Sequence, residues 1–214
     1  MAETAPSQTR SRKIAEGART IGLSVLFAFT VRIGVAQAYE VDGPSMEPTL
    51  FQGERVLALR CAYGLSIPWI TDALVMWSEP DPGDVVIVQS PVDGADLVKR
   101  VIGLPGDVIE VRGTEIIRNG VPLSATEMGP CDPARELDPS PRCRVFSVHI
   151  PLEDGERTHT TSLSEEELPR PPLTWVVPPE HVFVVGDHRD RSNDSRAFGP
   201  IPMSRIRARV LFVD

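Results

Sequence analysis

Several absences narrow the class of protein before any motif is considered. The sequence has only three cysteines, too few for a disulfide-stapled scaffold and without the spacing of a zinc finger. Basic residues are outnumbered, and the net charge of −8 disfavours an extended nucleic-acid-binding surface. Beyond the N-terminal region no run has the periodicity of a long amphipathic helix, and no internal repeat or long low-complexity tract is present.

Proline, by contrast, is abundant. The 214 residues include 21 prolines, about twice the usual share of roughly 5%. Because proline interrupts helices, this count disfavours a helical bundle and favours short strands joined by turns. The length suits one domain, or one domain with a sizeable insertion.

The N-terminal segment has the composition of a membrane-targeting sequence. Residues 1–17 are polar, and basic residues precede an apolar stretch over residues 20–38 that is broken by Arg32 and one glutamine. Two other interpretations are open: a cleaved signal peptide, because residues 36–38 (Ala-Gln-Ala) resemble a cleavage site, and an amphipathic helix on the membrane surface. We predict a single transmembrane anchor over residues 18–38, with Arg32 reaching the headgroups near its outer end. The basic flank predicts a cytoplasmic tail and an external domain.

The rest of the chain has an apolar period close to two residues, which is typical of β-strands. Short apolar runs bounded by Gly, Pro or Asp predict strands at residues 56–59, 85–88, 108–111, 182–185 and 206–213. Residues 107–123 are predicted to form a small meander, because Asn119-Gly120 is a favoured hairpin turn. The predicted fold is therefore mainly β, built from antiparallel sheets.

Residues 124–175 differ from this pattern. They are rich in Pro, Glu, Ser and Thr, and they contain both Cys131 and Cys143. We predict an inserted smaller β lobe here, which divides the main core into residues 39–123 and 176–214.

Three polar segments stand out against this β pattern. The first, residues 43–50 (Gly-Pro-Ser-Met-Glu-Pro-Thr-Leu), follows the predicted anchor and can also be explained as a proline-rich turn. The second, residues 97–107 (Leu-Val-Lys-Arg-Val-Ile-Gly-Leu-Pro-Gly-Asp), places Lys99 in an apolar strand, where a charged amine is costly unless it points to water. The third, residues 186–196 (Gly-Asp-His-Arg-Asp-Arg-Ser-Asn-Asp-Ser-Arg), can equally be a solvated turn held by Asp–Arg pairs.

In this order the three segments resemble the motifs of bacterial type I signal peptidases, which are membrane-anchored serine proteases with a serine–lysine dyad. The resemblance extends to residues 83–86, to the anchor and to the closing strands, and it leaves out the N-terminal tail and residues 124–175. It implies a signal-peptidase-type β catalytic core and the removal of N-terminal signal peptides from exported preproteins. It also implies a single-pass location in the bacterial cytoplasmic membrane, with the catalytic domain on the extracytoplasmic side.

The resemblance implies that Ser45 is the nucleophile and Lys99 the general base. A serine hydroxyl is a poor nucleophile unless a neighbouring base takes its proton. A lysine can be that base only if desolvation keeps its amine neutral near pH 7, and an apolar strand is a suitable place to desolvate it.

Supporting roles follow from the same resemblance. Ser192 matches a position whose hydroxyl orients the lysine amine, and Asp194 and Arg196 match a pair that braces the loop. Met46 is expected to pack over the lysine stem and exclude water. The backbone N–H of the nucleophile should supply one oxyanion donor. Many relatives have a serine side chain as a second donor where this chain has Gly43, so that donor is unassigned.

The resemblance also implies an extended substrate segment with small residues at the first and third positions before the cut. Shallow apolar pockets should receive these two side chains. The first pocket is expected to include Val41, Leu50, Leu97 and Val98, and the third Tyr39, Val41, Val56, Ile87 and Val98. Each of these residues can equally belong to the ordinary hydrophobic core. An exposed apolar surface beside the site would suit contact with lipid.

The expected partners are signal peptides, membrane lipid and, in passing, the secretion machinery, with no nucleic acid. No cofactor or metal is implied, and the sequence carries no indication of oligomeric state. The polar loop lacks the spacing and closing glutamate of an EF-hand calcium site. A Ser–His–Asp hydrolase fits poorly because Ser45 lacks the Gly-x-Ser-x-Gly elbow, so the four histidines are predicted to be surface or structural residues.

Two alternative functions are compatible with a related fold. A self-cleaving repressor would carry a DNA-binding or cleavable arm where this sequence has an apolar segment. A non-catalytic membrane scaffold has no need for both Ser45 and Lys99.

An external location also bears on the cysteines. Some members of the family have a disulfide in the inserted region, and a Cys131–Cys143 bridge would stabilise the fold by roughly 3 kcal/mol. We predict this bridge, with Cys61 left free as a small buried apolar residue.

Overall fold

The structure is a computed structural model that describes residues 16–25, 36–65, 75–137, 139–152, 154–164 and 172–211. Residues 16–25 form an exposed helix, and no helix among the described residues is long and apolar enough to cross a membrane. Residues 26–35, in the middle of the predicted anchor, lie outside the described part. The predicted end of the anchor is wrong, because residues 36–38 begin strand β1 (Ala36–Glu40) and pair with residues 57–59 of the next strand.

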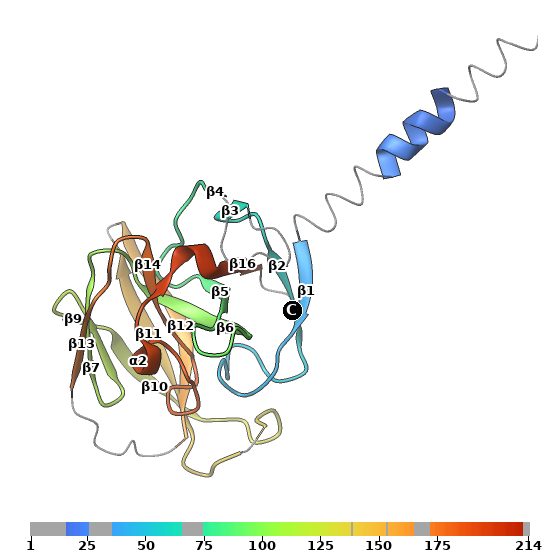
Figure 1. The fold of residues 1–214 in the computed structure, drawn as a ribbon. Coiled ribbons are helices and arrows are strands. Elements are labelled where there is room, and N and C mark those ends of the chain that lie inside the picture. Colours follow the sequence, from blue (N-terminus) through green and yellow to red (C-terminus); the bar gives the residue numbers. More distant parts are fainter. Residues whose placement is uncertain are drawn as a thin grey trace, which may run out of the picture.

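Seven strands form the largest sheet, which is antiparallel throughout. Its order is β1, β2 (Arg55–Leu59), β16 (Ile206–Leu211), β5 (Val85–Gln89), β6 (Asp96–Gly103), β14 (His181–Val185) and β15 (Ile201–Pro202). Strand β16 lies between β2 and β5 (Figure 1). The last strand in the sequence is therefore an interior strand of the sheet whose first two strands are β1 and β2. The antiparallel β fold predicted from the sequence is confirmed.

The burial of strands β2 and β5 follows their sequence patterns. In β2 the alternation is visible, since Val56 and Ala58 are buried and Leu57 is exposed. In β5 the four apolar residues 85–88 are all buried, because one apolar cluster packs on each face of the strand. A continuous apolar run is therefore expected here, in contrast to a strand with one wet face.

Three smaller sheets complete the described part of the domain. One has the order β13 (Leu173–Val176), β7 (Val108–Arg112), β8 (Glu115–Arg118) and β9 (Val121–Pro122). Another has the order β10 (Ser124–Pro130), β11 (Arg144–Leu152) and β12 (Gly155–Leu163), and a two-stranded sheet pairs β3 (Gly64–Leu65) with β4 (Val75–Met76). In Figure 1 the first two lie on the side of the domain away from β1 and β2. Helix α2 (Ser195–Phe198) and the 3-10 helix η1 (Met203–Arg205) precede β16.

The predicted meander at residues 107–123 is confirmed as β7, β8 and β9. Its hairpin turn has Asn119 at φ 54° and Gly120 at φ 78°, the left-handed conformations that a tight hairpin turn requires.

The predicted lobe at residues 124–175 is joined closely to the rest of the domain. Its strands β10, β11 and β12 form a sheet of their own, whereas β13 pairs with β7. One apolar cluster contains Ile102 and Phe183 from the large sheet together with Val148 and Ile150 from β11. The lobe and the large sheet therefore share a hydrophobic core.

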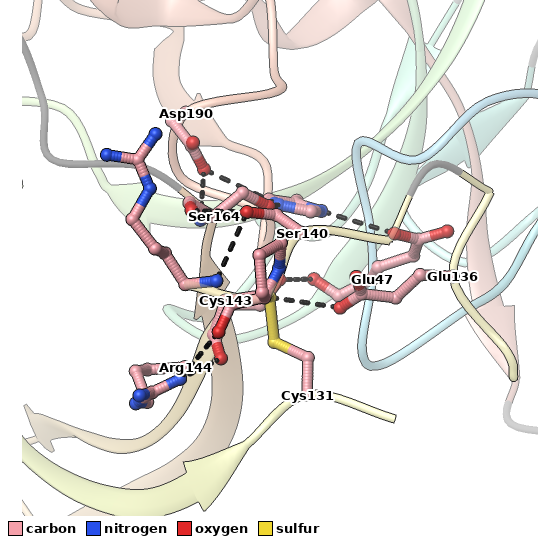
Figure 2. Close-up of a disulfide and its surroundings, with 12 residues drawn as sticks. Glu47, Cys131, Glu136, Ser140, Cys143, Arg144, Ser164 and Asp190 are labelled. Atoms are coloured by element: carbon pink, nitrogen blue, oxygen red, sulfur yellow. Dashed lines mark hydrogen bonds and ion pairs between the residues drawn. A yellow bond between two sulfur atoms is a disulfide. The ribbon is translucent and has the colours of Figure 1, made fainter. Parts of the chain in front are cut away.

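The predicted pairing of Cys131 with Cys143 is confirmed, with 5.4 Å between the two Cα atoms (Figure 2). The bridge closes the loop between β10 and β11. Cys61 is free, as predicted, but it is only half-buried rather than buried.

Candidate active site

Ser45 lies in a tight turn between β1 and β2. The backbone N–H of Glu47 donates to the Pro44 carbonyl at 3.1 Å, and the N–H of Leu50 donates to the Met46 carbonyl at 3.0 Å. The side chains of Met46 and Leu50 are buried in the apolar cluster beneath the turn, which holds it against the sheet. The two apolar residues thus anchor a segment whose serine stays half-buried.

Lys99 reaches the turn from β6. Its Nζ donates to Ser45 Oγ at 2.7 Å and to the Val98 carbonyl at 2.8 Å. Lys99 is only 2% exposed. The alternative in which this side chain points to water is therefore wrong.

The surroundings of Lys99 favour its neutral form. Burial removes water from the amine and lowers the pKa of Lys99 to about 8, although the negative charges of Asp194 and Asp187 oppose this shift. A lysine with this pKa is partly neutral near physiological pH. A neutral amine in hydrogen-bond contact with a serine hydroxyl can accept its proton, which is the first step of nucleophilic catalysis.

The loop at residues 186–196 is buried at both ends, with residues 190–192 half-buried and Asn193 exposed, so it is not a fully solvated turn. Arg196 forms two hydrogen bonds of 2.8 Å with the carboxylate of Asp194, which also accepts the backbone N–H of Gly186 at 2.9 Å and caps helix α2. Burial alone would raise the pKa of Asp194, but the pairing with Arg196 lowers it overall. The pair is internal to the loop, and its role as a brace stays a prediction.

Ser192 lies beside the dyad without a hydrogen bond to it. A Cβ atom added to Gly186 would collide with the Ser192 side chain and with the Ser45 carbonyl, so these three residues are in close contact. Within the described part of the chain the Ser192 Oγ makes no hydrogen bond to Ser45 or Lys99, and it lies close enough to Asp194 to help lower the pKa of that carboxyl group. An orienting role for Ser192 toward Lys99 stays a prediction.

A buried ion pair, which the sequence analysis did not single out, lies next to the dyad. Arg100 donates from Nε and Nη2 to the two carboxylate oxygens of Asp187 at 2.8 and 2.6 Å. The Thr49 hydroxyl donates to the same carboxylate. The sequence held a signal for this pair, because an arginine inside an apolar strand needs an acidic partner.

The residues predicted for the substrate pockets fall mostly in one place. Val41, Leu50, Val56 and Ile87 are buried in the same cluster as Met46, and Tyr39 and Val98 pack against it. Leu97 is the exception, because it packs against a different cluster that includes Val86, Val88 and Val101. Adjacent residues of a strand face opposite sides of the sheet, so Leu97 and Val98 diverge.

The oxyanion donors are assigned only in part. Among the hydrogen bonds of the described residues none uses the backbone N–H of Ser45, which leaves this donor available to a developing oxyanion. Gly43 has φ 84°, a conformation that favours glycine, and no atom lies within 4 Å of the place a Cβ would occupy. The chain is open at this point, on the approach to Ser45.

Possible metal ligands are engaged elsewhere. In the described ranges, the group of Cys131, Glu136 and Cys143 has ligand atoms close enough together for a metal ion, but the disulfide uses both sulfur atoms. In the polar loop, Asp187 and Asp194 are paired with arginines.

Comparison with known proteins decides the family. The sequence profile of the family described as "Signal peptidase, peptidase S26" matches residues 14–213. The chain belongs to this family. The signal peptidase I of Pseudomonas aeruginosa is 29% identical over 175 residues, which are 80% of this chain and 59% of that protein. The signal peptidase I of Leptolyngbya laminosa is 28% identical over 215 residues, which are 98% of this chain and 84% of that protein.

The coverage of these S26 relatives is uneven. This chain spans about three fifths of the length of the Pseudomonas aeruginosa and Pseudomonas fluorescens peptidases. A crystal structure of a signal peptidase I from Enterococcus faecalis V583 is 28% identical and covers 63% of this chain and 98% of its own, with a TM-score of 0.36. That superposition is too limited to support an argument about the fold.

Proposed function

We propose that this chain is a signal peptidase, a serine endopeptidase that removes N-terminal signal peptides from exported preproteins. Ser45 is the nucleophile and Lys99 the general base. The observation that carries the proposal is the hydrogen bond of 2.7 Å between the Lys99 amine, whose pKa is lowered to about 8, and the Ser45 hydroxyl. The membership in the peptidase S26 family supports the same function.

The reaction follows from this contact. The neutral Lys99 amine takes the proton of Ser45 Oγ as the oxygen attacks the carbonyl carbon before the scissile bond. The backbone N–H of Ser45 stabilises the oxyanion, and the Lys99 ammonium then returns the proton to the leaving amine. Water hydrolyses the resulting ester. The pockets for alanine-sized side chains before the cut would be lined by the apolar residues beneath the turn, of which Tyr39 and Val98 are only partly buried.

Substitution of the nucleophile tests this proposal. The Ser45→Ala protein should fold with an unchanged thermal midpoint, because only one hydroxyl is lost, and should leave a purified preprotein uncut. The wild-type chain in detergent should release the mature protein, with the cut site read by mass spectrometry. Ser204→Ala is a matched control far along the chain. Processing by Ser45→Ala at the wild-type rate would rule out Ser45 as nucleophile.

We also propose a membrane anchor that ends before β1. Residues 18–35 would extend about 27 Å as a helix, near the lower limit for a span, with residues 1–17 in the cytoplasm. The catalytic core would then begin with β1 and comprise residues 36–123 and 176–214, with residues 124–175 inserted. Exposed apolar residues suit lipid contact, and among them Leu57 and Leu211 are neighbours across β2 and β16.

Topology can be measured in cells that make the full chain. Protease added outside spheroplasts should digest the domain from β1 onward, because the basic flank retains the tail in the cytoplasm. The protein should stay with membranes after carbonate extraction, and a cytoplasmic marker protein should survive the protease. Recovery of a soluble form that lacks residues 1–38 would contradict the anchor.

A further inference from the structure

A second buried polar cluster lies behind the Ser45 turn and takes no part in the proposed chemistry. Its members are Glu47, His188 and Ser164, and none of the three has exposed surface. Glu47 Oε2 lies 3.3 Å from His188 Nδ1, and the other ring nitrogen of His188, Nε2, lies 2.6 Å from Ser164 Oγ. Figure 2 shows Glu47 and Ser164 in this cluster, beside the disulfide. Glu47 and His188 are 141 residues apart in the sequence.

The contacts around His188 limit which way its hydrogen bonds run. Burial is the main cause of the lowered pKa of His188, which favours the neutral ring with a proton on one nitrogen. With that proton on Nδ1, the ring donates to Glu47 and Nε2 accepts the hydroxyl proton of Ser164. Asp190 Oδ1 accepts the backbone N–H of Ser164 at 3.0 Å and lies 3.4 Å from His188 Nε2.

A carboxylate, an imidazole and a hydroxyl in this order also occur in Ser–His–Asp hydrolases. A second catalytic centre is excluded, however, because a substrate cannot reach a serine with no exposed surface. The burial of the Glu47 carboxyl group instead requires a structural account, since a polar group away from water is costly unless hydrogen bonds satisfy it. Here both of its oxygens are satisfied.

Two further hydrogen bonds hold the backbone of the turn from Ser45 to Glu47. The carbonyl of Ser45 accepts the backbone N–H of His188 at 3.1 Å. Two residues later, the carbonyl of Glu47 accepts the hydroxyl of Ser162 at 2.9 Å. The turn is therefore tied to the loop that begins at residue 186 and to the end of β12.

The loop closed by the disulfide contacts both ends of the cluster. Glu47 Oε1 accepts the backbone N–H of Leu137 at 3.1 Å, and the Ser140 hydroxyl donates to the carbonyl of Ser164 at 3.0 Å. Leu137 and Ser140 of this loop thus add one hydrogen bond each to the cluster.

We propose that Glu47, His188 and Ser164 are positioning residues that hold Ser45 Oγ within reach of the Lys99 amine. This inference rests on the proposed serine–lysine mechanism. Loss of the Glu47–His188 contact removes one side-chain link between the turn and the loop and leaves the link from Thr49 to Asp187 in place. A displacement of about 1 Å can cost roughly a hundredfold in rate. Substrate binding does not involve these buried groups, so KM should change little.

The test uses the full chain in detergent and a peptide with alanine at the first and third positions before the cut. Glu47→Ala and His188→Ala should each lower kcat by roughly tenfold to a hundredfold, with KM little changed. The double variant should be no slower than the slower single variant, because one contact is lost in all three. His188→Asn, whose amide can still donate to Glu47, should restore most of kcat.

A pH profile separates positioning from an electrostatic effect on the base. The charges acting on the pKa of Lys99 are those of Asp194, Asp187 and Arg196, so the pH limb of each variant should coincide with that of wild type. A limb that moves, or a kcat that recovers at high pH, would overturn the proposal. An unchanged kcat per folded enzyme in both Glu47→Ala and His188→Ala would also overturn the proposal.

The matched control is an exposed pair of the same kind. His149 Nδ1 lies 3.2 Å from Glu156 Oε1 between β11 and β12, and Glu156→Ala and His149→Ala should leave kcat unchanged. If the buried variants do not fold, Ser164→Ala removes a single hydroxyl and should lower kcat more weakly, whereas wild-type kcat in folded Ser164→Ala would overturn the proposal. Failure of the wild-type chain itself to cut the peptide would instead count against the proposed function.

Discussion

Replacement of Lys99 by methionine or arginine should abolish processing while the protein stays folded. Methionine fills much of the same space but has no titrating group, and arginine stays protonated at any usable pH. Neither can take the proton of Ser45, so we expect kcat to fall by roughly 10⁴-fold or more. Both rates are measured by single-turnover cleavage of the peptide used above.

The thermal stability of the Lys99→Met variant should not fall with its activity. Lys99 is 2% exposed, and its amine is desolvated without a carboxylate in contact. An apolar side chain of similar length avoids this cost, so the thermal midpoint of Lys99→Met should equal or exceed that of wild type. The chain has one other lysine, and Lys13→Met is the matched control that should keep full activity. Near-normal cleavage by folded Lys99→Met would end the serine–lysine hypothesis.

The pH dependence of wild-type activity follows from the same amine. Because the neutral form is the base, kcat/KM should be low at acid pH, rise through about pH 8 and level off above it. The limb should be absent from the residual activity of Lys99→Met. A limb near 10.4, the ordinary value for lysine, would mean that the amine is solvated in the free enzyme.

Among the substitutions proposed for this protein, Asp187→Asn should cause the largest loss of folding stability. It leaves the guanidinium of Arg100 buried without a countercharge, which costs about 3–5 kcal/mol. Asp187 and Arg100 are 1% and 4% exposed, so water cannot compensate. The free energy of unfolding, from urea titration, measures the loss.

The loss of folding stability in Asp187→Asn should depend on pH. Burial alone would raise the pKa of Asp187, but Arg100 lowers it overall. When folding lowers the pKa of a carboxyl group, the group stabilises the folded protein at any pH above the pKa it has in the unfolded chain, which is about 4. This contribution is lost as the pH falls toward the pKa in the folded protein. The gap between wild type and Asp187→Asn should therefore narrow in acid.

An exposed ion pair provides the control for this experiment. Glu110 lies 2.7 Å from Arg112 at the surface of β7, close to the separation in the buried pair. Since exposed pairs contribute about 0–1 kcal/mol, Glu110→Gln should have little effect. Equal losses for the two variants would show that burial of the Arg100–Asp187 pair is not what matters.

Local patterns in the sequence determined much of this protein. The period of two in residues 85–88 and 182–185 predicted strands, because side chains of a strand alternate between its faces. Asn119-Gly120 predicted a hairpin because few other residues adopt the backbone angles of that turn. The order of the three polar segments singled out Ser45 and Lys99, whose side chains the structure brings into contact.

The tertiary structure decided what depends on the packing of distant segments. Residues 36–38 look apolar enough for an anchor, yet their backbone pairs with β2, and only the sheet order determines that pairing. Leu97 and Val98 are adjacent and equally apolar, and they separate because each faces a different cluster. The contact between Glu47 and His188 joins segments that no local pattern links. Burial is a property of the assembled sheets, so the sequence alone cannot distinguish a solvated polar loop from one that is closed over by its neighbours.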